Sequence, residues 1–266
     1  GIPREKLENS ALRFGSLGAR RNSIGVFGVG LNRALFKLGK SFKITSETKH
    51  EKTSISLDTD EYFSHDDWHV PIVDESKGNA TGTTIEIHEL THDAAEDFSN
   101  SKWMEDFIYH IQRRYEKFLN EGLEIEVNTE SIKGHAVEIK NADFPIQTRD
   151  FRKDDVEASI TAGQHSLHMY PYEAEKAGRA KDNDGELTKE YGWTVYCNDR
   201  AVLFSDRTKD TGVNGKFHGE HYGFVGKGDF TGKSQYLPWN TTKTGVDLKH
   251  AITKKAVVIM EKHNEN

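Results

Sequence analysis

The stretch Ile24-Gly25-Val26-Phe27-Gly28-Val29-Gly30-Leu31 decides how the rest of the sequence is interpreted. Its glycines follow the pattern Gly-x-x-Gly-x-Gly and lead into a run in which Leu31, Leu35 and Leu38 recur at helical spacing. Glycines let a backbone approach a ligand closely, and the free N–H groups at the start of a helix attract phosphate. The stretch therefore predicts a phosphate-binding turn at a helix start, while a glycine-rich turn that only packs tightly would have the same pattern.

Strands and helices are predicted around this stretch from the spacing of apolar residues. Residues 1–23 are polar and loop-like, residues 42–58 alternate as in a β-hairpin, and residues 83–88 alternate as in a single strand. From Trp103 to Leu119 the apolar residues instead form one helical stripe. Further elements are expected at 193–197 and 201–204, two strands joined by the turn Asn198-Asp199, and at 248–262, a helix. This order predicts an α/β protein of two units that meet near residue 95.

Composition excludes several classes of protein. The 266 residues carry a net charge of -7, which argues against a generally basic coat for nucleic acid. The single cysteine, Cys197, can form neither an internal disulfide nor a cysteine-based zinc cluster. No apolar run approaches the roughly 20 residues of a membrane helix, so no membrane partner is expected. We expect a cytoplasmic protein, or a nuclear one if its source is eukaryotic.

A zinc-peptidase motif offers an alternative interpretation. The run His88-Glu89-Leu90-Thr91-His92 matches H-E-x-x-H, in which a helix presents both imidazoles to zinc and the glutamate activates water. The alternation just before it predicts a strand, on which positions four apart lie about 13 Å from each other. That separation is too large for two bonds of about 2 Å to one zinc. The zinc metallopeptidase is kept as the alternative hypothesis.

Three further runs resemble one enzyme superfamily, together with the glycine stretch and its continuation at Gly39 and Ile44-Thr45-Ser46. They are Thr81-Gly82-Thr83-Thr84-Ile85-Glu86-Ile87, the strand-turn run from Gly192 to Arg200, and Leu237-Pro238-Trp239-Asn240-Thr241-Thr242-Lys243-Thr244. In this order they resemble the GHKL ATPases, which include gyrase B subunits, heat-shock chaperones, sensor histidine kinases, MutL and MORC proteins. The likeness to MORC-like and bacterial members extends over most of the chain.

The resemblance implies a fold and a role for each matching residue. Residues 1–94 would be the C-terminal part of a Bergerat ATP-binding fold with its lid, and residues 95–266 a transducer-like α/β domain, both two-layer sandwiches. Thr83 would support the adenine, and Lys243 would be the catalytic residue that stabilises charge on the transferring phosphoryl group. The residues implied in holding the phosphates are Gly25, Val26, Phe27, Gly28, Val29, Gly30 and Leu31.

The resemblance also implies ATP and Mg²⁺ as ligands, and a conformational cycle. In the family, ATP binding and hydrolysis drive lid closure and dimerisation, so a homodimer with a DNA or protein client is expected for the intact protein. The family's catalytic Glu, its magnesium-binding Asn and its adenine-reading Asp would all precede Gly1. We therefore expect the 266 residues of this chain to hold only part of the site. We assign no metal ligand within the 266 residues and expect them to hydrolyse little ATP by themselves. A non-catalytic binding module is the other alternative.

Overall fold

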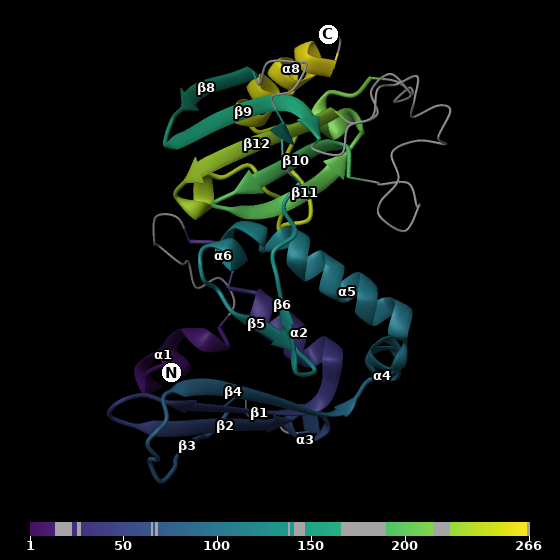
Figure 1. The fold of residues 1–266 in the computed structure, drawn as a ribbon. Helices are drawn as coiled ribbons and strands as arrows, with labels where there is room; N and C mark the ends of the chain where they lie inside the picture. Colours follow the sequence, from purple (N-terminus) through teal and green to yellow (C-terminus); the bar gives the residue numbers. More distant parts are fainter. Residues whose placement is uncertain are drawn as a thin grey trace. The chain divides into compact units, whose positions relative to one another are not determined.

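The computed structural model shows an α/β chain of two compact units (Figure 1). The first unit comprises Gly1–Gly18 and Gly25–Asp106, and the second comprises Ala19–Ile24 and Phe107–Asn266. The structure describes residues 1–13, 23–25, 28–64, 66, 69–137, 139–140, 147–165, 190–214 and 224–264. Across these ranges, no helix combines the length and the apolar composition that crossing a bilayer requires.

The first unit is built on a four-stranded antiparallel sheet in the order β3-β2-β1-β4. Its strands are β1 (Gly39–Glu47), β2 (Lys52–Asp58), β3 (Ile72–Asp74) and β4 (Gly82–Leu90), and its helices are α1 (Arg4–Lys6), the π-helix η1 (Leu7–Ala11), α2 (Gly30–Leu38), α3 (Thr59–Ser64) and α4 (His92–Ser99). β1 and β2 pair from Ser41↔Asp58 to Glu47↔Lys52, which confirms the predicted hairpin. β4 confirms the predicted strand over residues 83–88.

One face of this sheet is apolar and carries the core of the first unit. The core residues are Leu7, Leu35, Phe42, Ile44, Ile55 and Leu57. Leu7 comes from η1, so the expectation that residues 1–23 are loop-like is wrong for residues 4–11. Burial of this leucine against the sheet stabilises a short helix that its polar neighbours do not predict.

The second unit contains a six-stranded sheet in the order β11-β10-β12-β9-β7, with β8 also pairing with β9. Its strands are β7 (Ile139–Lys140), β8 (Gln147–Lys153), β9 (Val156–His165), β10 (Gly192–Cys197), β11 (Arg200–Asp206) and β12 (Phe224–Gly232). The other elements are α5 (Ser101–Arg114), α6 (Glu116–Asn120), the β5–β6 hairpin (Ile125–Val127 and Glu130–Ile132), the 3₁₀ turns η2 (Lys209–Thr211) and η4 (Ser234–Tyr236), and α8 (Ala251–Asn264). The boundary between the units falls within α5.

The two faces of the second sheet differ in chemistry because strand residues alternate between them. On one face α8 packs against β8 and β9 (Figure 1) and contributes the buried side chains Ile252, Ala256 and Met260. On the other face α6 makes polar contacts with β10 and β12, among them a hydrogen bond from Tyr196 to Glu116. Thus an apolar layer fixes the sheet on one side, and the other side is available for polar groups.

Candidate functional site

The glycine stretch leads into α2, as the sequence predicts. Gly28 has a φ of +60°, a left-handed conformation that favours glycine, and α2 begins at Gly30. The N-cap residue Val29 makes no side-chain capping hydrogen bond to the N–H groups of the first turn. A Cβ placed on Gly30 would meet nothing within 4 Å. Among the described residues, no side chain caps or covers the start of α2, which suits an anion. Val26 and Phe27 lie outside the described residues.

Thr83 lies at a polar end of the apolar sheet face. It pairs with Ser46 of β1, and their hydroxyl oxygens are 3.1 Å apart. Ser46 Oγ also accepts a hydrogen bond of 2.5 Å from the backbone N–H of Ile2. On the other side of Ser46, the register places Thr53, whose buried hydroxyl has no hydrogen-bond partner among the residues that the structure describes. The face that is apolar at Phe42 and Ile44 thus ends in a row of hydroxyl groups that can exchange hydrogen bonds with a polar ligand.

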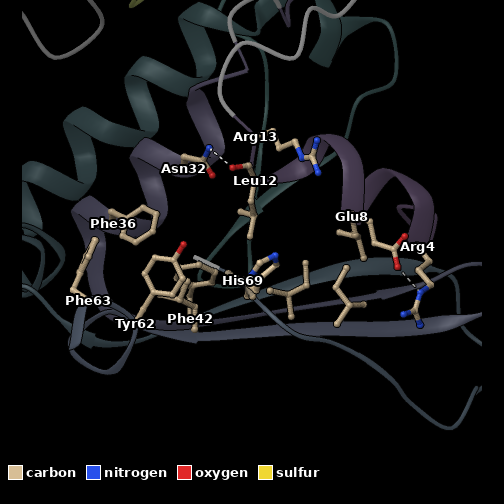
Figure 2. A pocket seen from close by; sticks show the side chains of 15 residues that line it. Arg4, Glu8, Leu12, Arg13, Asn32, Phe36, Phe42, Tyr62, Phe63 and His69 are labelled. Carbon is tan, nitrogen blue, oxygen red and sulfur yellow. Dashed lines mark hydrogen bonds and ion pairs between the residues drawn. The ribbon is translucent and has the colours of Figure 1, made fainter. Parts of the chain in front are cut away.

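A cavity of about 670 Å³ opens over the apolar rows of the same sheet face (Figure 2). Its lining comes from α1, η1, α2, α3 and strands β1 to β3, and includes Phe42, Leu57 and Tyr62. Asn32, in the first turn of α2, donates from Nδ2 to Leu12 O at 3.0 Å, while within the described part of the chain its buried Oδ1 has no hydrogen-bond partner. Cavities of this size with apolar walls and a few polar groups are typical of small-molecule sites.

Lys243 belongs to the second unit and is held on three sides. Its Nζ donates to the backbone carbonyl of Ile24 and lies 5.0 Å from the centre of the Trp239 ring. Arg200 Nη1 donates to Lys243 O at 2.7 Å, and Lys243 itself has a left-handed φ of +55°. Burial lowers the pKa of Lys243, and the nearby charge of Arg200 lowers it further. The side-chain amine of Lys243 is thus partly desolvated, and the backbone of this residue is held by Arg200.

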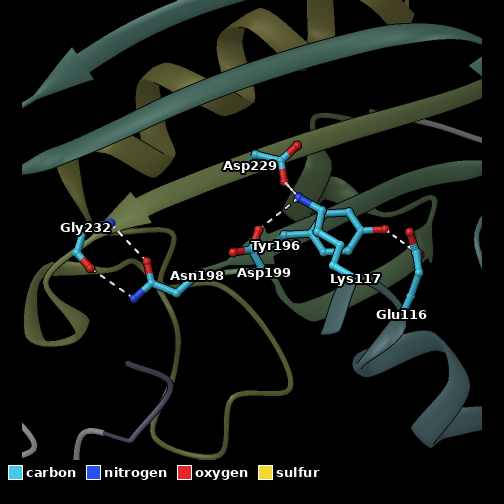
Figure 3. A network of polar contacts seen from close by, with 7 residues as sticks. All are labelled: Glu116, Lys117, Tyr196, Asn198, Asp199, Asp229 and Gly232. Atoms are coloured by element: carbon cyan, nitrogen blue, oxygen red, sulfur yellow. Dashed lines mark hydrogen bonds and ion pairs between the residues drawn. The ribbon is translucent and has the colours of Figure 1, made fainter. Parts of the chain in front are cut away.

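The turn Asn198-Asp199 supplies a group that the sequence analysis treated only as a turn residue. Both residues have positive φ, +45° and +64°, which confirms the predicted tight turn between β10 and β11. The Asn198 side chain forms a ring of two hydrogen bonds with Gly232, each 3.0 Å long (Figure 3). Its Nδ2 also donates to Ser23 O at 3.1 Å, and Ser234 Oγ donates to the same carbonyl. The only sequence signal was the asparagine itself, which turn preference already explains.

The residues predicted to act together are placed in separate units. Thr83 and the segment from Gly28 to Leu31 belong to the first unit, together with Gly25. Lys243 belongs to the second unit, as do Ser23 and Ile24. Lys243 donates a hydrogen bond to the carbonyl of Ile24. The structure thus describes two parts of a candidate site, each within its own unit.

The zinc alternative lacks the helix that it requires. His88 lies in β4, and Glu89 has a left-handed φ of +49°. His92 begins α4, and its side chain is 89% exposed. Among the residues that the structure describes, no three His, Cys, Asp or Glu side chains gather as a metal site. This finding contradicts the zinc metallopeptidase hypothesis based on His88, Glu89 and His92.

In the comparison with known proteins, a family model matches the first part of the chain. Residues 1–96 match the family model described as "Histidine kinase-, DNA gyrase B-, and HSP90-like ATPase". A comparison with curated proteins gave no match.

Proposed function

We propose that the chain binds ATP through its first unit, because residues 1–96 match the model of the histidine kinase-, DNA gyrase B- and HSP90-like ATPases. The observation that carries the proposal is the open start of α2, where Val29 provides no cap and Gly30 leaves the approach clear. A triphosphate is the part of ATP that such a helix start attracts. Gly25, with Val26 to Leu31, is proposed to surround the phosphates.

The adenine is proposed to lie at the polar end of the sheet face. Thr83 supports this role through its contact with Ser46, which connects it to the backbone of Ile2. Hydroxyl groups that already exchange hydrogen bonds can give or accept one more from the ring nitrogens of a base. The apolar rows beneath the cavity suit the flat faces of the base.

Lys243 is proposed as the residue that stabilises charge on the transferring phosphoryl group. Its ammonium is bonded to the Ile24 carbonyl and partly desolvated, and an ammonium in such surroundings stabilises a phosphate charge more strongly than one in water. ATP is proposed to bind with Mg²⁺, which when bound would neutralise phosphate charge. Because no metal-binding cluster occurs in the described residues, none of them is assigned as a magnesium ligand.

The proposal extends to the rest of the chain. We propose that residues 95–266 act as a transducer-like domain, that ATP binding closes a lid and promotes a homodimer, and that the client is DNA or another protein in the cytoplasm or nucleus. The support is the position of Lys243 in the second unit, on the loop that resembles the family's transducer loop.

A substitution at Gly30 tests ATP binding. Nothing within 4 Å would contact the new methyl group of Gly30→Ala, so folding is expected to be unaffected. The methyl group would stand where a phosphate approaches α2, so the affinity for ATP, measured by calorimetry, is expected to fall about tenfold. A wild-type chain that binds no ATP would refute the proposed function.

A substitution at Lys243 tests its role in hydrolysis. Where ATP hydrolysis is measured, Lys243→Ala is expected to lower its rate about 100-fold, because one group that stabilises the transition state is lost. Lys254→Ala, on the exposed face of α8, is the matched control and should leave the rate unchanged. An unchanged rate in Lys243→Ala would exclude the proposed role, and binding of ATP without any turnover would favour the non-catalytic module.

A further inference from the structure

Three side chains of the second unit converge on two successive backbone carbonyls. Ser23 O accepts hydrogen bonds from Asn198 Nδ2, at 3.1 Å, and from Ser234 Oγ. The next carbonyl, that of Ile24, accepts from Lys243 Nζ. The donors come from the β10–β11 turn, from η4 and from the loop that follows it, which are separate elements. The next residue along the chain, Gly25, is the first of the glycine stretch.

Asn198 is built to direct one amide hydrogen at Ser23. It is only 1% exposed, and its backbone N–H donates to Phe230 O at 2.9 Å. Its Oδ1 accepts from Gly232 N and its Nδ2 donates to Gly232 O, so the orientation of the amide is fixed (Figure 3). The second hydrogen on Nδ2 is then available for Ser23 O. Since this donor is already ordered, holding the carbonyl costs little side-chain entropy.

The turn that carries Asn198 is fixed by charge as well. Lys117 Nζ lies 3.3 Å from Asp199 Oδ1 and also contacts Asp229 of β12 (Figure 3). Burial opposes the charge on Lys117, but the two carboxylates outweigh this effect and raise its pKa. The lysine is therefore charged at neutral pH and ties the turn to the neighbouring strand. Ser234, the second donor, is itself buried.

We propose that Asn198 and Ser234 are positioning residues that hold the chain directly before the phosphate-binding turn. This inference rests on the proposed ATP function. Ser23 precedes Gly28 by five positions, so the turn can move at most about 18 Å from a fixed Ser23 and much less if the intervening residues are bent. Holding the carbonyl lowers the conformational freedom that ATP must remove when it orders the glycine stretch. Release of the carbonyl would therefore weaken ATP binding without altering any group that touches ATP.

Ser234→Ala is the cleanest test, because it removes one hydroxyl and leaves the Asn198–Gly232 ring intact. Asn198→Asp is the second variant, since it keeps the acceptor for Gly232 N and loses the donor to both Ser23 O and Gly232 O. Ser159→Ala, on β9, is the matched control, because it removes a hydroxyl that takes no part in holding Ser23. The first readout is the Ile24 δ1-methyl signal in NMR spectra of the full chain without nucleotide. The second is the affinity for ATP.

We expect the Ile24 methyl of Ser234→Ala to move toward the position and high mobility of a disordered isoleucine. ATP affinity is expected to fall about 5-fold, as for the loss of one hydrogen bond. Where ATP hydrolysis is measured, the KM for ATP should rise while kcat changes little. General destabilisation of the fold would not change KM alone. Ser159→Ala should match the wild type in every readout.

Unchanged Ile24 signals in both Ser234→Ala and Asn198→Asp would show that these donors do not hold the segment, and would overturn the inference. A released Ile24 with unchanged ATP affinity would overturn the positioning role while leaving ATP binding intact. If the wild type binds no ATP, the proposed function fails, and with it the positioning role for ATP. The Ile24 signal still decides whether the segment is held.

Discussion

Replacing Tyr196 by Phe tests a buried polar pair of the second unit. Tyr196 donates from its hydroxyl to Glu116 Oε2 at 2.8 Å, and the two residues are 1% and 4% exposed. Burial and the Glu116 carboxylate both raise the pKa of Tyr196, so the phenol keeps its proton and remains a donor at any pH of interest. The substitution removes only this hydroxyl and leaves the ring that packs beneath Lys117, 4.3 Å from its Nζ.

The size of the effect follows from the charge and the burial. A hydrogen bond to a charged group contributes about 1.5–3 kcal/mol, and a buried partner left without it is also costly. Tyr196→Phe is therefore expected to lower the free energy of unfolding by about 2 kcal/mol. Glu116→Leu, which leaves the phenol without its acceptor, should cost about 2 kcal/mol as well. In the double variant both partners are apolar, so its total loss is expected to be about 1 kcal/mol, well below the sum of the single losses.

Urea unfolding of the full chain, followed by tryptophan fluorescence, measures these differences. Trp193 and Trp239 are buried in the second unit and report on its unfolding. A loss of 2 kcal/mol should move the midpoint by about 1 M urea. Additive losses in the double variant would refute the reasoning, because two side chains that form a hydrogen bond must show coupling.

Two further predictions concern the α8 side of the same sheet. A Cβ on Gly226 would lie 2.1 Å from the Trp193 ring, and one on Gly228 would lie 2.6 Å from the flexible tip of Met260. Gly226→Ala should therefore lower the free energy of unfolding by about 3 kcal/mol, and Gly228→Ala by only about 1 kcal/mol. Urea unfolding measures both losses, and equal losses would contradict this account. Burial, assisted by the charge of Arg149, lowers the pKa of His263, so the unfolded chain binds more protons than the folded one below the ordinary histidine pKa of 6.5. Stability should therefore fall as the pH decreases through 6.5, and a His263→Gln variant that loses stability just as steeply would refute the assignment.

Local patterns predicted the elements whose burial alternates regularly. The hairpin of β1 and β2 has a buried side chain at every second position around Phe42 and Ile44, and this pattern is visible in the sequence. β9 was missed because its inward residues include Ala158 and Ala162, which are small and also common in helices and loops. Its strand conformation depends on pairing with β8 and β12, which is a property of the tertiary structure.

The candidate site was predictable only where glycines or a motif mark it. The helix start at Gly30 follows from the glycine pattern, because glycine readily adopts the positive φ that Gly28 has just before the helix. The sequence predicts no role for Ser46, and only the register Ser46↔Thr83 brings it to Thr83. Ser234 lies more than 200 positions from Ser23, so no local pattern could indicate that they form a hydrogen bond. The functions proposed for Thr83 and Lys243 stay predictions.

The insertion of residues 19–24 into the second unit has a consequence for biosynthesis. The first unit is synthesised in full once Asp106 is added, whereas the last donor to this segment, Lys243, follows about 140 residues later. At about 5–20 residues per second, the ribosome needs roughly 7–28 s for that interval. Until it ends, Ser23 and Ile24 lack the full set of donors Asn198, Ser234 and Lys243, and a nascent chain can fold the four-stranded sheet before that set is complete. Ser23 and Ile24 therefore obtain their full set of donors late, although they are among the first residues to be translated.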